Sequence, residues 1–191
     1  MGRFLLGVIV CLILIPVAVL GWLRFGKVPV AVADPPFPFE QQIVGIPLDA
    51  RIQRESIKTP PIQPNEENLT AGAHIYSEKC SICHGFHGKP SAIGPKMYPD
   101  APPLWQKHPD NEVVGVSDDP PGETYWKVAN GIRLTGMPTF RQVLTENEIW
   151  QVSLLLANAD KPLPPAAADI LRGEAPPAPA PAEAASPAAA R

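Results

Sequence analysis

The sequence is poor in cysteine, histidine and positive charge. Its 191 residues contain three cysteines and four histidines, and sixteen basic residues stand against nineteen acidic ones, for a net charge of −3. This balance excludes the basic face with which nucleic-acid-binding proteins contact phosphates. No stretch of the chain repeats another, so we expect a single functional centre.

Two of the three cysteines stand three residues apart and are followed at once by a histidine, in Cys80-Ser81-Ile82-Cys83-His84. This spacing matches the attachment site of a c-type haem. On one helical turn both thiols can reach the two vinyl groups of a porphyrin and form thioethers. His84 then points a ring nitrogen at the iron as a fixed axial ligand.

Two other interpretations of the paired cysteines need residues that the sequence lacks. A structural zinc site requires two further ligands at similar spacing, and the remaining cysteine, Cys11, lies in an apolar run. A thioredoxin-like dithiol requires a surrounding pattern of strands and helices, which is absent. We therefore interpret Cys80 and Cys83 as haem attachment points.

The N-terminus contains an uncharged apolar run of twenty residues, 4–23, which suits a membrane-spanning helix. Arg3 precedes the run, and Arg24 and Lys27 follow it. A cleaved signal peptide is the alternative, with Ala31-Val32-Ala33 as the small-residue cleavage site. Removing these three basic residues from the sixteen leaves thirteen against nineteen acidic ones in residues 34–191, a net charge of −6.

Proline divides the rest of the chain, because most of the 26 prolines lie before the cysteine motif or after residue 160. We expect an anchor or signal peptide at 1–33, an extended proline-rich linker at 34–67, a folded domain at 68–160 and an alanine- and proline-rich tail at 161–191. The tail has too little apolar surface to order itself, beyond a last docking contact at Ile170-Leu171.

The linker carries apolar residues that a plain spacer does not need. We expect part of it to pack on the domain or on a membrane partner. These residues are Ile43, Val44, Ile46 and Ile52.

Three helices are predicted within the folded domain. The first covers 68–79, where Gly72 and Tyr76 share a face that another helix can approach closely. The second covers 121–130, with proline in its first turn and Gly131 just past its end. The third begins after Thr145, which forms a capping box with Glu148, and runs to about residue 158.

A second axial ligand is predicted at Met137, which lies between Gly136 and Pro138 on a loop far downstream of His84. A thioether is a soft, neutral ligand that suits iron and favours its reduced state. The competing residues are Met97, His87 and His108. Met97 and His87 follow His84 so closely that we expect neither to reach the opposite face of the porphyrin.

With these motifs in this order, the chain resembles the class I cytochromes c. It is most similar to the mono-haem, membrane-anchored bacterial members related to cytochrome subunits of oxidases and dehydrogenases. The resemblance covers about residues 69–159. It implies an all-α domain of three to four helices around one haem c, covalently bound through Cys80 and Cys83, with His84 and Met137 on the iron.

The resemblance also implies the surroundings of the haem. The proline of Gly94-Pro95 is expected to offer its carbonyl to His84, which would orient the ring. The side chains expected to line the pocket are those of Trp126, Ile132 and Phe140. In this family the first and last helices cross, which would place Gly72 and Tyr76 against Val152 and Leu155.

The function implied is electron transport rather than catalysis on a small-molecule substrate. We expect a tethered carrier of single electrons, or a subunit of a respiratory or photosynthetic complex, with redox proteins as partners. Because c-type haem is attached outside the cytoplasm, we expect a single-pass protein of the bacterial cytoplasmic membrane with a periplasmic haem domain. If Met137 does not bind iron, the alternative is a haem enzyme or gas sensor with an open sixth position.

The apolar run generates a first prediction: residues 4–23 remain attached in the mature protein, because twenty uncharged residues are long for the core of a signal peptide. The intact mass of protein extracted from membranes should equal that of the whole chain plus haem. A mature N-terminus at Asp34 would instead show a soluble periplasmic carrier.

Overall fold

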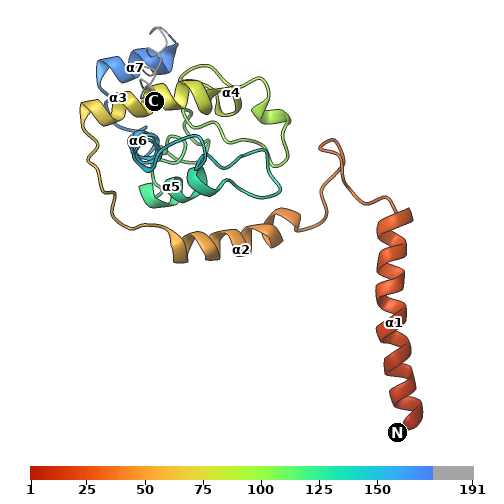
Figure 1. Ribbon diagram of the computed structural model, residues 1–191. Helices are drawn as coiled ribbons and strands as arrows, with labels where there is room; N and C mark the ends of the chain where they lie inside the picture. The colour runs from red at the N-terminus through yellow and green to blue at the C-terminus, as the bar shows by residue number, and fades with distance from the viewer. Residues whose placement is uncertain (174–191) are drawn as a thin grey trace, which may run out of the picture. The chain divides into compact units, whose positions relative to one another are not determined.

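The computed structural model describes residues 1–173, and every regular element in that range is a helix, which confirms the predicted all-α class. Two compact units, Met1–Ile43 and Val44–Arg191, divide the chain and are described separately. The elements, labelled in Figure 1, are α1 (Gly2–Phe25), α2 (Glu40–Glu55), α3 (Glu66–Lys79), α4 (Ser81–His84), the short 3-10 helix η1 (Gly94–Lys96), α5 (Pro121–Asn130), α6 (Glu146–Leu156) and α7 (Pro165–Arg172).

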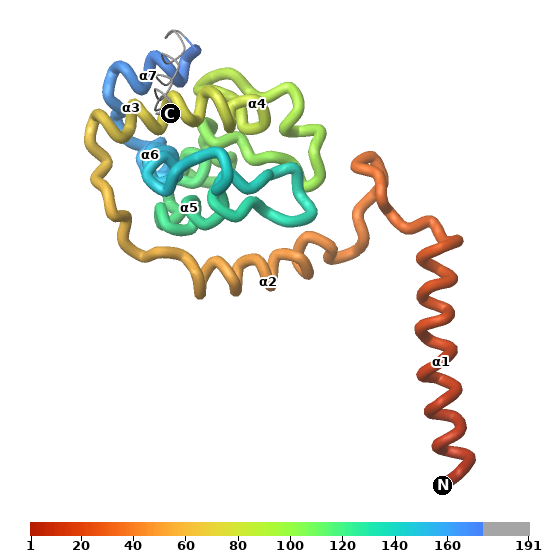
Figure 2. The backbone as a smooth tube through the Cα atoms, viewed as in Figure 1, coloured from red at the N-terminus to blue at the C-terminus, as the bar shows by residue number. Residues whose placement is uncertain are grey.

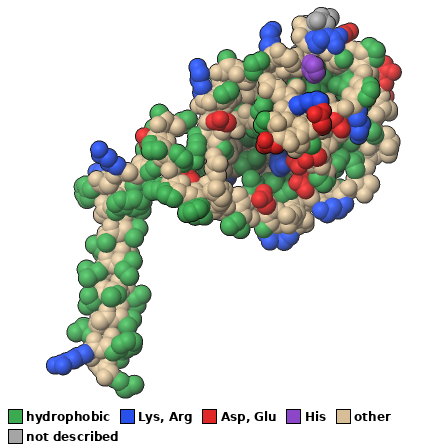
Figure 3. All heavy atoms as spheres, turned by 180° about the vertical axis from the view of Figure 1, so that it is seen from behind, with side chains coloured by type: hydrophobic (Ala, Val, Ile, Leu, Met, Phe, Trp, Pro, Cys, Tyr) green, Lys and Arg blue, Asp and Glu red, His purple; other side chains and the backbone are tan. Residues whose placement is uncertain are grey.

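Helix α1 contains the predicted apolar run. Apolar side chains cover its visible face in Figure 3, and none of its residues is buried. Its most apolar 18-residue window has a mean hydropathy of 3.0, and its 24 residues are long enough to cross a membrane by length and composition. The element therefore has the properties of a membrane anchor.

The second unit is built on the crossing of α3 and α6. Helix α3 begins at Glu66, two residues before the predicted start at 68, because the Asn65 side chain caps it by accepting a hydrogen bond from the Asn68 backbone N–H at 2.9 Å. Helix α6 begins at the predicted capping box, with both the Thr145 and Glu148 bonds formed. Figure 2 shows α6 passing across α3.

Glycine makes this crossing close, as the sequence predicts. A Cβ at Gly72 would overlap the carbonyl oxygen of Gln151 and lie 3.2 Å from Cβ of Leu155. Tyr76, one turn later, is fully buried, and its hydroxyl donates to the Gly85 carbonyl at 2.7 Å. The crossing therefore fixes both α3 and the chain that follows the cysteine motif.

Helix α5 also matches its predicted bounds and packs on α6. The Tyr125 ring stacks on that of Trp150 with centroids 4.3 Å apart. Gly131 ends the helix with a φ of 67°, a conformation that glycine adopts without strain. Gly122 lies directly against the carbonyl oxygen of Ile57, so the end of the linker is packed on α5.

Two helices were not predicted. Residues 40–55 form α2 where the prolines led us to expect extended chain, and Pro47 lies inside it. Packing of Ile52 into the second unit overrides the local preference. Helix α7 lies in the expected tail, where Pro165 occupies the first turn, and it packs on α3.

The predicted docking contact at Ile170-Leu171 is confirmed, since both side chains are buried on α7. The ordered domain thus extends beyond residue 160. The remaining part of the expected tail, 174–191, lies outside the described residues.

The crossing generates a prediction with a matched control. Gly72→Ala should lower the melting temperature, because backbone atoms of α6 leave no room for a methyl group, at a cost of about 1–3 kcal/mol. Gly45→Ala in α2 makes the same change where the nearest atom is 4.0 Å away, so it should be neutral or stabilise by up to about 1 kcal/mol. Thermal unfolding of both variants decides the matter, and equal shifts would contradict a close crossing.

Candidate haem site

The cysteine motif lies where α3 ends and α4 begins. Cys80 is the C-cap of α3, and Cys83 and His84 belong to the single turn of α4. All three side chains line a cavity of about 210 Å³. Gly94 packs against the Cys83 carbonyl, where any Cβ would overlap the oxygen, so the glycine of Gly94-Pro95 holds the loop against the motif.

The ring of His84 is oriented by a hydrogen bond from its Nδ1 to a backbone carbonyl, as expected, but the carbonyl is that of Pro102 rather than Pro95, at 2.7 Å. A carbonyl only accepts, so Nδ1 carries the proton and Nε2 is left to bind a metal. Burial lowers the pKa of His84, and the Pro102 bond partly offsets this. The neutral form, which is the ligand form, is therefore favoured.

The thiol of Cys80 does not have the properties of a redox nucleophile. Burial, with a smaller contribution from Cys83, raises its pKa to about 12. A reactive dithiol needs a lowered pKa. Among residues 1–173 there is also no group of three or more His, Cys, Asp or Glu side chains placed to hold a metal ion. The surroundings thus favour neutral sulfur, the state of a thioether.

Met137 lines the same cavity as His84. Its loop is folded on itself: the Met137 N–H donates to the Thr135 hydroxyl at 3.1 Å, and the Ile132 N–H donates to the Met137 carbonyl at 3.2 Å. Gly131, at positive φ, lies against the backbone around Pro138. The backbone of Met137 is therefore fixed at the cavity wall.

Met97 also lines the cavity, and this differs from our expectation that it stays near His84. A Cβ at Gly136 would overlap the Met97 methyl group, so the Met97 side chain reaches the loop that carries Met137. The other two competitors, His87 and His108, do not line the cavity. The His108 ring is bonded to the Gly115 carbonyl at 2.6 Å.

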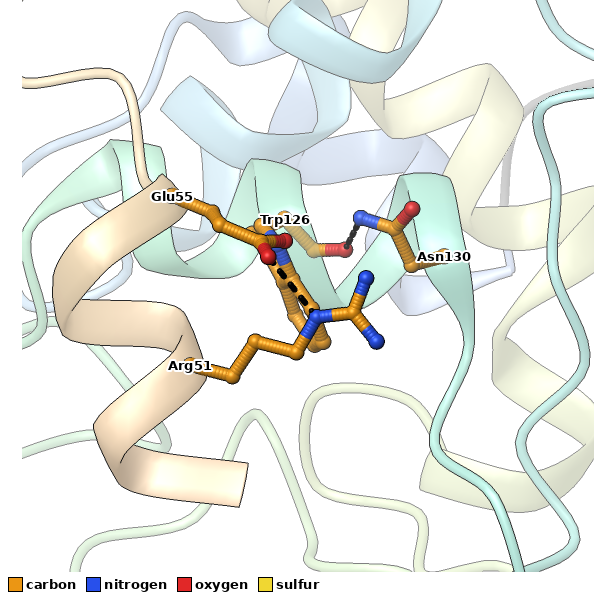
Figure 4. Close-up of polar contacts among 4 residues, drawn as sticks. All are labelled: Arg51, Glu55, Trp126 and Asn130. Atoms are coloured by element: carbon orange, nitrogen blue, oxygen red, sulfur yellow. Dashed lines mark hydrogen bonds and ion pairs between the residues drawn. The ribbon is translucent and has the colours of Figure 1, made fainter. Parts of the chain in front are cut away.

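Of the three residues expected to line the pocket, one lies at the cavity and two do not. Phe140 lines the cavity, whereas Trp126 and Ile132 do not. Figure 4 shows Trp126 beside α2, where its Nε1 donates to the Glu55 carboxylate at 2.9 Å. Trp126 thus faces away from the cavity, because α5 presents opposite sides to the cavity and to α2.

Sequence reasoning missed the side of α5 that does face the cavity. Thr124, Lys127 and Val128 line it, and their spacing of three and four residues is that of one helical face. The Thr124 hydroxyl oxygen is buried with no hydrogen-bond partner among the described residues. Lys127 is paired with Asp119 at 2.9 Å. A buried unpaired hydroxyl is costly, so it indicates that the cavity receives a group with polar atoms.

These residues fit a haem c. The donors are two thiols at attachment spacing, an imidazole with Nε2 available and a thioether, and the rest of the cavity wall is largely apolar.

Residues 67–154 match the family model described as "Cytochrome C oxidase, cbb3-type, subunit III". A similar solved structure is the Kuenenia stuttgartiensis reducing HAO-like protein complex Kustc0457/Kustc0458, at 23% identity and a TM-score of 0.40. The alignment covers 52% of this chain and 46% of that one, so less than half of that chain is spanned. No curated protein matches.

The all-helical fold, the Cys80-x-x-Cys83-His84 turn and the family match over 67–154 lead to one conclusion. Residues 67–154 form a cytochrome c domain similar to the cbb3-type family, and this domain follows an N-terminal apolar helix.

Proposed function

We propose that the chain is a membrane-tethered carrier of single electrons, with one haem c bound through Cys80 and Cys83. The observation that carries this proposal is that His84, held by Pro102, and Met137, held by its loop, line one cavity. The proposed location is the periplasmic side of the bacterial cytoplasmic membrane, with α1 as the anchor.

When bound, haem c supplies an iron that takes up and releases one electron. The residues of this chain do the rest. His84 and Met137 would both bind the iron, which would leave no open position for a substrate. Apolar side chains such as Leu104, Val128 and Phe140 exclude water from the cavity, and a neutral sulfur ligand favours the reduced state.

A docking site for redox partners is supported by apolar side chains at the surface beside the cavity residues. Ile82, between the two cysteines, is 68% exposed, and Leu134, three residues before Met137, is 82% exposed. Exposed apolar groups of this kind suit brief protein contacts, because they are desolvated on docking without buried charge. We propose that partners approach at Ile82 and Leu134.

Met137 gives the test of this function. Met137→Ala should remove the ferric absorption band of the sulfur–iron bond and allow an added ligand such as imidazole to bind. Met137→His should keep a six-coordinate low-spin spectrum but lower the reduction potential by on the order of a few tenths of a volt, because imidazole favours the ferric state. Absorption spectroscopy and redox titration measure both effects.

Met97→Ala and His87→Ala are the controls for this experiment. Both variants should keep the sulfur–iron band. His87 lies outside the cavity. The Met97 side chain contacts Gly136 and does not take the place of the Met137 side chain. Loss of the band in Met97→Ala, with its retention in Met137→Ala, would assign the ligand to Met97. Absence of the band from the unmodified protein would favour a haem enzyme or gas sensor.

The family description favours a second candidate, a fixed subunit of an oxidase or a related oxidoreductase complex. The full chain, extracted in mild detergent, should then elute together with other membrane redox proteins. A free carrier should elute alone and still exchange electrons with membranes from which it was removed. Size-exclusion chromatography with mass spectrometry of the eluted proteins distinguishes the two.

A further inference from the structure

Helix α2 carries two apolar stripes on opposite sides. One stripe is partly or fully buried and consists of Leu48 and Ile52, spaced by four residues. The other is formed by Ile43, Ile46, Pro47 and Ala50, with the spacing i, i+3, i+4, i+7, and Arg54 continues the same face at i+11. Since nine residues make about two and a half helical turns, Ile43 lies on the opposite side of the helix from Ile52.

The first stripe attaches α2 to the cytochrome domain. Ile52 is only 3% exposed. Beside it, Glu55 accepts the Trp126 indole hydrogen bond at 2.9 Å, and the Arg51 guanidinium lies 5.8 Å from the centre of the same ring (Figure 4). Arg51 and Glu55 are also paired at 2.8 Å. On this side of α2, Ile52 is buried and Arg51 and Glu55 contact Trp126 of α5.

The second stripe, in contrast, is mostly exposed. Ile43 is 63% exposed and Ile46 is 70% exposed, although both lie on an ordered helix where a polar residue would be more favourable in water. Arg54 continues this face at the C-terminal end of α2, and Glu40, whose carboxylate accepts from the Phe37 N–H, lies at its N-terminal end. Apolar side chains followed by a single basic one on the same face suit a lipid surface, where the chains enter the acyl region and the guanidinium meets phosphate.

The chain itself keeps α2 near a bilayer. Helix α1 ends at Phe25 and α2 begins at Glu40, so fourteen residues join them. Fully extended, fourteen residues reach at most about 50 Å. A protein partner can also supply an apolar surface, but only the membrane is guaranteed to lie within this reach of an anchored chain.

We propose that the second stripe of α2 rests on the surface of the lipid bilayer and holds the cytochrome domain beside it. The proposal rests on the membrane anchoring proposed above. Contact on one side with lipid and on the other with α5 limits how the cytochrome domain can turn. Its redox partners are then proteins whose electron entry site lies close to the membrane surface.

The test uses the full chain in lipid-only nanodiscs that contain phosphatidylcholine and phosphatidylglycerol. Starting from Cys11→Ser, single cysteines are introduced as Ile43→Cys, Ile46→Cys and, as control, Gln41→Cys, and each is labelled with a nitroxide. Gln41 is exposed and lies on the opposite side of α2 from Ile43. Electron paramagnetic resonance then measures the accessibility of each label to oxygen, which concentrates in lipid, and to a water-soluble nickel chelate.

Labels at positions 43 and 46 should show an oxygen-to-nickel accessibility ratio several-fold higher than the label at 41. Equal ratios at all three positions would overturn the proposal, and a protein partner would then be the occupant of the stripe, because these discs contain none. In the double variant Ile43→Ser/Ile46→Ser, the oxygen-to-nickel accessibility ratio of a label introduced through Ala50→Cys should fall, while the haem spectrum should stay unchanged. The matched polar change Gln41→Ser/Gln42→Ser should leave that ratio unchanged.

Two readouts separate this proposal from the function on which it rests. The unmodified Cys11→Ser protein should take up no label, because Cys80 and Cys83 are thioethers; labelling there would contradict haem attachment. Loss of the protein from the discs would contradict the anchor. A protein that passes both checks and still exposes Ile43 and Ile46 to the nickel chelate contradicts only the lipid contact.

Discussion

The close contact between α3 and α6 is the constraint on which the rest of the domain depends. Gly72 allows the two backbones to approach, and this fixes the direction in which α3 delivers Cys80 to the cavity. Tyr76 extends the same constraint to Gly85, beyond the motif, through a buried hydrogen bond. The position of the thiols is therefore set by helix packing, not by the four-residue α4 alone.

Helix α5 connects the cavity with helix α2, because one of its sides lines the cavity and the other side contacts α2. Thr124, Lys127 and Val128 form part of the cavity wall, while Trp126 is bonded to Glu55 of α2. Any movement of α2 relative to the domain must therefore break a charge-assisted hydrogen bond to a residue adjacent to the wall.

The sequence predicts what is local and misses what depends on packing. The capping box at Thr145 and the bounds of α5 involve only neighbouring residues, and both are confirmed. Pro95 was assigned a bond that Pro102 makes, because the path of the loop decides which carbonyl reaches His84. Trp126 was placed in the pocket by the family resemblance, and its indole N–H is satisfied elsewhere. The apolar residues of the linker indicated packing, and Ile52 is indeed buried, but the prolines outweighed this signal and helix α2 was missed.

The packing of α7 on α3 has a consequence for the order in which the protein is made. Helix α3 ends at Cys80, directly before the turn that contains Cys83, and its two main packing partners, α6 and α7, come from residues 146–172. A chain that emerges from its N-terminus must therefore present Cys80 and Cys83 well before these helices arrive. Contacts between such distant segments close late in folding. Both thiols of the motif are thus accessible to solvent before the helices that complete the core have been made.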